Sequence, residues 1–178
     1  MNTRSPLIKL GVRNGLIAGL LSNVLLIATY YILGRHPLMV SPFMDFRVIL
    51  FGVFIFFTLK EFREDHQEGA LYFWQGMVGS FIFVMVAGTL SSILLWAFCS
   101  FDSNFIPSYV KAMTEYLNTF SAEDIGRIGK EVFDSTIQQL PLTTGKQIAG
   151  KYFIQSVMIG FFVSIIISVI LRKQPQTN

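Results

Sequence analysis

Four long apolar stretches, separated by polar segments, dominate the chain and predict four membrane-spanning helices. They cover about residues 14–33, 43–59, 71–98 and 152–171. A helix rises about 1.5 Å per residue, so roughly 20 apolar residues cross the hydrocarbon core of a bilayer. The second stretch has the shortest uncharged run, Val48–Leu59. We expect Arg47 and Lys60, which flank this run, to extend towards opposite membrane interfaces.

A polar segment between the third and fourth stretches predicts an extramembrane helical loop at about residues 101–146. Two amphipathic helices are expected in it. The apolar positions of the first follow helical spacing at Tyr109, Met113, Tyr116, Leu117 and Phe120. The second begins with a Ser121–Asp124 capping box, and its apolar face is formed by Ile125, Ile128, Val132 and Ile137. We interpret the pair as a connector that shields its own apolar face; covering the outer end of the bundle, lying in the membrane interface and receiving a partner are the alternatives.

The last spanning helix is expected to begin before its apolar run. Thr143 and Thr144 precede Lys146, and threonine is a favourable residue at the N-cap of a helix. We therefore expect the helix to start near Lys146, with one of these threonines as its cap.

Composition supports a single all-α membrane domain over residues 1–178, built as a four-helix bundle. The chain is 52% hydrophobic and only 14% charged, whereas soluble domains carry about 25% charged residues. The net charge is +3, and the basic residues lie beside the ends of the apolar stretches. Nucleic-acid binders instead gather such residues on one face. The expected environment is therefore the lipid bilayer, with no nucleic-acid partner.

Lysine and arginine placement predicts the orientation. With the N-terminus inside, the inner and outer segments hold equal numbers of basic residues, but the inner segments are much shorter. Their higher basic density favours a cytoplasmic location for both termini. The polar loop then lies outside.

Small residues recur at four-residue spacing in three of the stretches. The set comprises Gly11, Gly15 and Gly19 in the first, Gly76, Ser80, Gly88 and Ser92 in the third, and Ser156, Gly160, Ser164 and Ser168 in the fourth. Lipid supplies no hydrophobic force between helices, so close backbone approach at small residues provides the attraction. We expect these stripes to pack the helices within one chain; contact with a second copy or a larger membrane complex is the alternative.

Four carboxamides lie within or beside the spans: Asn14, Asn23, Gln75 and Gln155. An amide in hydrocarbon is costly unless it is hydrogen-bonded. We expect these side chains to bond between helices. The alternative is that they line a path for a neutral solute.

Chemistry-bearing motifs are scarce. The middle of each span lacks ionisable residues, which ion-coupled transporters usually place there. The cluster of Glu61, Glu64, Asp65 and Glu68 around His66 matches no metal-ligand signature and is interpreted as a solvated connector. Asp45, Glu61 and His66 are the only loose candidates for an enzyme site, and Asp45 falls on the opposite side of the membrane. We therefore expect no catalytic, metal or cofactor site, and no enzyme.

The layout resembles a family of small bacterial four-helix membrane proteins catalogued only as a domain of unknown function. The residues that carry the resemblance are Asn14-Gly15, the turn from Lys60 through Arg63 to Gly69, and Phe73, Gln75 and Gly76, followed by the polar loop. The resemblance implies a four-span fold in the bacterial inner (plasma) membrane and supplies no activity.

Together these features predict a non-enzymatic structural or accessory subunit that packs against itself or a larger membrane complex. A small-solute transporter or channel component is the alternative, and it requires the four amides to converge on a water-accessible cavity.

Overall fold

The computed structural model describes residues 6–32, 34, 36–41 and 44–173. Within these ranges the fold is all-α. The long helices are α1 (Pro6–Ile32), α2 (Phe46–His66), α3 (Phe73–Phe101) and α7 (Gly145–Leu171). The shorter elements are η1 (Pro37–Met39), α4 (Phe105–Leu117), α5 (Ala122–Ile128), α6 (Lys130–Gln139) and η3 (Leu140–Leu142). The predicted all-α fold class is confirmed.

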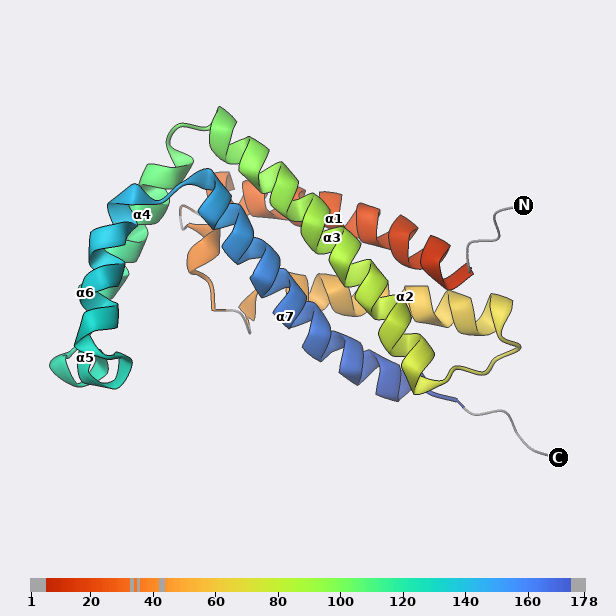
Figure 1. The fold of residues 1–178 in the computed structure, drawn as a ribbon. Helices are drawn as coiled ribbons and strands as arrows, with labels where there is room; N and C mark the ends of the chain where they lie inside the picture. Colours follow the sequence, from red (N-terminus) through yellow and green to blue (C-terminus); the bar gives the residue numbers. More distant parts are fainter. Residues whose placement is uncertain (1–5, 33, 35, 42–43, 174–178) are drawn as a thin grey trace.

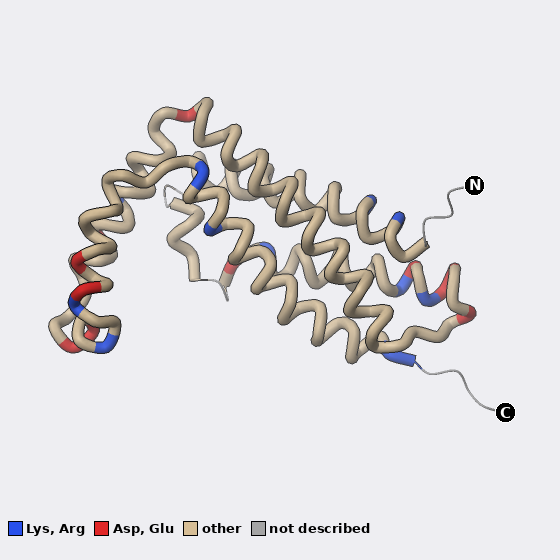
Figure 2. The backbone as a smooth tube through the Cα atoms, viewed as in Figure 1, with Lys and Arg blue, Asp and Glu red and all other residues tan. Residues whose placement is uncertain are grey.

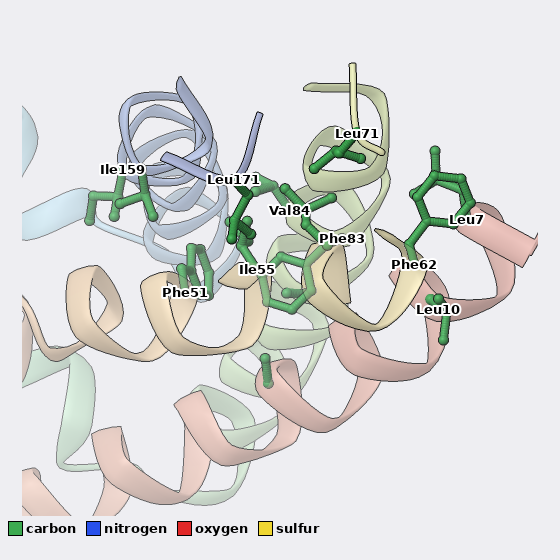
Figure 3. Close-up of a cluster of buried hydrophobic side chains, with 14 residues drawn as sticks. Leu7, Leu10, Phe51, Ile55, Phe62, Leu71, Phe83, Val84, Ile159 and Leu171 are labelled. Atoms are coloured by element: carbon green, nitrogen blue, oxygen red, sulfur yellow. The ribbon is translucent and has the colours of Figure 1, made fainter. Parts of the chain in front are cut away.

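The four long helices lie side by side as a bundle (Figure 1). Helix α3 packs along both α1 and α7, and α2 packs against α1 and α7 on the other side. Figure 3 shows the buried centre, where Phe51 and Ile55 of α2 lie near Phe83 of α3 and Ile159 of α7. The Phe51 and Phe83 rings meet edge to face at 5.6 Å. This apolar centre holds α2 in the bundle.

The predicted count of four spanning helices is not matched. Three described helices, α1, α3 and α7, are long and apolar enough to cross a membrane. Helix α2 continues to His66, and six of its 21 residues are charged. Its uncharged run of 12 residues, Val48–Leu59, extends only about 18 Å at the usual helical rise. The predicted start at Phe43, like the predicted end of the first span at Leu33, lies outside the described residues.

Helix α7 begins before its apolar stretch because a cap, not hydropathy, sets its first residue. Helix α7 starts at Gly145, and the Thr144 hydroxyl accepts from the backbone N–H of Gln147. The expected threonine cap is therefore confirmed at Thr144.

At the other end of the bundle, Leu71 and Lys173 exchange two backbone hydrogen bonds of 2.8 and 3.0 Å. These bonds tie the end of α7 to the start of α3.

The loop between α3 and α7 contains three short α-helices, not the predicted two. Gly129, with φ +95°, separates α5 from α6, and a left-handed residue cannot continue a right-handed helix. The predicted capping box at Ser121 and Asp124 is confirmed. Helices α4, α5 and α6 form an arm that extends away from one end of the bundle (Figure 1). Tyr109 and Leu117 are buried, as expected of a pair that shields its own apolar face, but Ile128, Val132 and Ile137 are 46%, 55% and 41% exposed, so the prediction is wrong at these three positions.

Candidate functional site

The glycines of α1 form a close contact with α3. A Cβ atom on Gly15 would lie 2.8 Å from the carbonyl oxygen of Phe83, and one on Gly19 would lie 3.0 Å from that of Ala87. Gly11 comes similarly close to the backbone of Gly79. The two helices therefore meet backbone to backbone, with space for no larger residue.

A second close contact joins α3 to α7 along the other predicted stripes. A Cβ atom on Gly76 would lie 2.7 Å from the hydroxyl oxygen of Ser168. Gly88 lies against Phe153 and Ser156, and Gly160 lies against Val84. Ser80, Ser92, Ser156, Ser164 and Ser168 are all buried. The structure thus places the predicted small residues of α1, α3 and α7 at contacts within one chain.

The serines contribute mainly through their size. Ser156 and Ser164 donate to carbonyl oxygens one turn earlier on their own helix. The hydroxyls of Ser80, Ser92 and Ser168 have no hydrogen-bond partner among the described residues. At Ser80, Ser92 and Ser168 it is therefore small volume, not interhelical hydrogen bonding, that lets the helices approach.

The two amides of α1 are bonded inside the bundle. Asn14 donates to the hydroxyl of Thr58 on α2 at 2.8 Å. Asn23 donates to the carbonyl oxygens of Gly19 and Ser91, each at 3.1 Å. Both side chains are buried, so each links α1 to a neighbouring helix.

The two glutamines lie at opposite ends of the bundle. Gln75 accepts from the backbone N–H of Tyr72 in the first turn of α3 and donates to Gln67. Gln155 on α7 accepts from Arg47 at 2.8 Å. The four predicted amides therefore have separate partners and are not brought together around one cavity.

An unexpected polar cluster surrounds Arg47 near the first turn of α2. The Arg47 side chain is only 1% exposed, so the expectation that it extends towards a membrane interface is wrong. Nε donates to Asp45 Oδ1 at 2.9 Å, and Nη2 donates to Asp45 Oδ2 at 2.5 Å. Two such charge-assisted hydrogen bonds add both strength and geometric specificity to the ion pair.

The remaining donors of Arg47 bind helix α7. Nη1 donates to the Tyr152 carbonyl oxygen at 3.2 Å and to the Ser156 hydroxyl at 2.7 Å. Nη2 also donates to Gln155, and the guanidinium carbon lies 3.9 Å from the centre of the Tyr152 ring. A guanidinium carries five N–H donors, and here all five have an acceptor. The buried charge is thereby neutralised, and α2 is fixed to α7.

Local structure explains how Asp45 reaches this position. It is the N-cap of α2, with extended backbone angles, and its carboxylate accepts from the Arg47 backbone N–H at 2.9 Å. Asp45 is itself 7% exposed. The spacing of Asp45 and Arg47 is visible in the sequence, but nothing there indicates that Gln155 and Ser156 would face them.

Other charged groups lie near the ends of the bundle and on the arm (Figure 2). In the predicted acidic cluster, Glu61 forms an ion pair with Arg13 of α1 at 2.6 Å, and Glu64 pairs with Arg63 at 3.2 Å. The described residues contain no group of three or more His, Cys, Asp and Glu side chains able to hold a metal ion. Glu61 thus links α2 to α1, whereas Glu64 pairs within α2.

His36 lies where the arm joins the bundle. Its imidazole contacts the rings of Tyr30, Phe105 and Tyr109, and Nδ1 accepts from the backbone N–H of Leu38. Burial lowers the pKa of His36 to about 4, and the nearby Phe105 carbonyl offsets only part of that effect. The ring is therefore neutral at pH 7 and serves as a packing element between η1 and α4.

Comparison with known proteins supplies a family and no activity. A family model described as a protein of unknown function, DUF4199, matches residues 13–173. This match confirms the predicted resemblance to a domain of unknown function. No curated protein and no solved structure matches the chain.

Proposed function

Because the chain belongs to the DUF4199 family, whose function is unknown, we propose a role for it from its structure. The protein is a non-enzymatic integral membrane subunit that presents its arm to another protein chain, either a second copy or a member of a larger membrane complex.

The observation that carries this proposal is the exposed apolar side of the arm. Ile128, Val132, Ile137 and Leu142 are each at least 41% exposed. They lie on short helices outside the long apolar bundle (Figure 1). Four large apolar side chains exposed within 15 residues, outside the lipid-facing surface, are the feature for which a protein partner would account.

The polar interior argues against the alternative role in solute transport. The NH2 groups of Asn14 and Asn23 donate to Thr58 and to backbone carbonyls, and the Gln155 oxygen accepts from Arg47. A solute path through the bundle would need polar groups with free hydrogen-bonding capacity facing a common cavity. These groups instead hold helices together, as expected of a scaffold.

We also propose that all four long helices lie in the bacterial inner membrane, with both termini in the cytoplasm. Ile49, Val53 and Phe57 of α2 are 74%, 46% and 58% exposed, which is favourable against acyl chains. One charge at each end of this apolar run is paired, Arg47 with Asp45 and Glu61 with Arg13. Paired charges lower the cost of placing a short apolar run within the bilayer.

The test is purification of the tagged protein from its native membrane in a mild detergent, followed by mass measurement of the intact complex. We expect a stoichiometric second chain. Val132→Glu should release it, because the substitution places a charge on the exposed apolar side of α6. Gln138→Glu adds the same charge to the same helix at an exposed polar position that does not neighbour Val132 and should retain the partner. A wild-type protein that is a lone monomer, or a partner retained equally by both variants, would refute the proposal.

A further inference from the structure

A pocket of about 230 Å³ lies where α7 meets η1 and α4. Its walls are apolar at Leu38, Met113 and Ile148, and its polar groups come from Tyr109, Lys151 and Gln155. Tyr152 also lines it and carries the Arg47 guanidinium against its ring. The pocket therefore lies directly beside the buried ion pair.

Arg47 determines which end of the Gln155 amide remains free. Its guanidinium donates to Gln155 Oε1 at 2.8 Å, and a guanidinium has no acceptor. The amide oxygen is therefore held on Arg47, and the NH2 group is the part of Gln155 left to serve the pocket. Because the oxygen of Gln155 is held by Arg47, Gln155 can act towards the pocket only as a hydrogen-bond donor.

The charge of the pocket is positive. Lys151 is exposed and contributes an ammonium group, while the nearby Asp45 carboxylate is occupied by Arg47. No carboxylate is among the described residues that line the pocket. Lys151 and Gln155 are four residues apart on one side of α7. An ammonium and an amide NH2 beside apolar walls match a carboxylate attached to an apolar stem, since charge-assisted hydrogen bonds to carboxylates are strong.

We infer that this pocket binds a small amphiphilic carboxylate, with its anionic head on Lys151 and Gln155 and its apolar stem against Leu38, Met113 and Ile148. The volume is below the roughly 300–1,000 Å³ of sites for drug-sized ligands, so the bound portion is short. It comes either from a water-soluble short-chain acid or from the head end of a membrane fatty acid. Because the walls come from both α4 and α7, the ligand bridges the arm and the bundle. The site exists whether or not the arm has a protein partner.

The experiment is calorimetric titration of hexanoate into the full chain in nanodiscs of zwitterionic lipid. We expect saturable binding and no binding of hexylammonium, which has the same stem and the opposite charge. Lys151→Met should weaken hexanoate binding about tenfold or more, the usual effect of losing a charge-assisted hydrogen bond. Lys146→Met, which removes another exposed lysine of α7 that lines a different groove, should leave the affinity unchanged.

Gln155→Glu is the second informative variant. It keeps an acceptor for Arg47 but replaces the free NH2 donor with a carboxylate oxygen, so it should weaken hexanoate binding without unfolding the bundle. Adding oleate to the nanodisc distinguishes the source: competition with hexanoate indicates a membrane fatty acid, and its absence indicates a soluble acid. Absence of saturable hexanoate binding, equal binding of hexylammonium, or unchanged affinity in Lys151→Met would overturn the proposal.

Discussion

The Arg47 cluster provides the sharpest test of how the bundle is held together. Replacing Arg47 with Met keeps the apolar stem and removes the guanidinium. The Asp45 carboxylate, 7% exposed, then loses both of its side-chain hydrogen bonds and remains buried. Removing one partner of a buried ion pair typically costs about 3–5 kcal/mol. For a chain of this size each kcal/mol lowers the melting temperature by roughly 2–4 °C, so we expect a fall of about 10 °C.

The assay uses the single cysteine of the chain, Cys99, which is 7% exposed. A thiol-reactive fluorogenic dye reports its exposure as the purified protein is heated in detergent. Arg63→Met serves as the control, because Arg63 pairs with Glu64 at 3.2 Å in a partly exposed setting. A surface pair of this kind contributes about 0–1 kcal/mol, so its melting temperature should change little.

A double variant, Asp45→Asn with Arg47→Met, separates the ion pair from simple packing. Asparagine keeps the N-cap acceptor of α2 and carries no charge. We expect the double variant to regain most of the stability lost in Arg47→Met, because no uncompensated carboxylate remains in the interior. If the double variant is as unstable as Arg47→Met, or if Arg47→Met behaves like the Arg63 control, the electrostatic explanation is refuted.

Two further predictions concern the helix contacts and the junction of the arm. Gly15→Ala should destabilise the bundle by about 1–3 kcal/mol, the usual effect of overpacking, since its Cβ would lie 2.8 Å from the Phe83 carbonyl oxygen. The control is Gly150→Ala, which has nothing within 4 Å of the new Cβ and should be neutral or stabilising. Equal effects of the two substitutions in the dye assay would contradict this explanation. Stability should fall as the pH drops, because His36 takes up a proton in the unfolded chain near its ordinary pKa of 6.5 and in the folded chain only near about 4. The loss accumulates between these two values at about 1.4 kcal/mol per pH unit, so about 2 kcal/mol is lost by pH 5, reduced to about 1 kcal/mol by partial solvent screening. Denaturation at pH 7.5 and pH 5 should show this loss in the wild type and not in His36→Phe.

Sequence pattern alone determined the helical class and the small residues through which the helices pack. Lipid-facing helices need long apolar runs, and close packing without a hydrophobic force needs small residues. Gly15 and Gly76 could therefore be identified from spacing, and the structure places both where a Cβ would meet the neighbouring helix. The threonine cap of α7 and the capping box at Ser121 were also readable, since both depend on residues within one turn.

Only the tertiary structure decided the partners of groups distant in sequence. Arg47 and Ser156 are 109 positions apart, and Asn14 bonds Thr58 across 44 positions; no local pattern encodes which face of one helix meets which face of another. From hydropathy alone Arg47 was interpreted as a charge flanking the apolar run, because hydropathy does not include the carboxylate and the polar groups of another helix that neutralise its guanidinium. The break at Gly129 was likewise decided by backbone conformation, and the exposure of apolar residues on the arm by the distance of the arm from the bundle. Helical periodicity in the sequence contains neither kind of information.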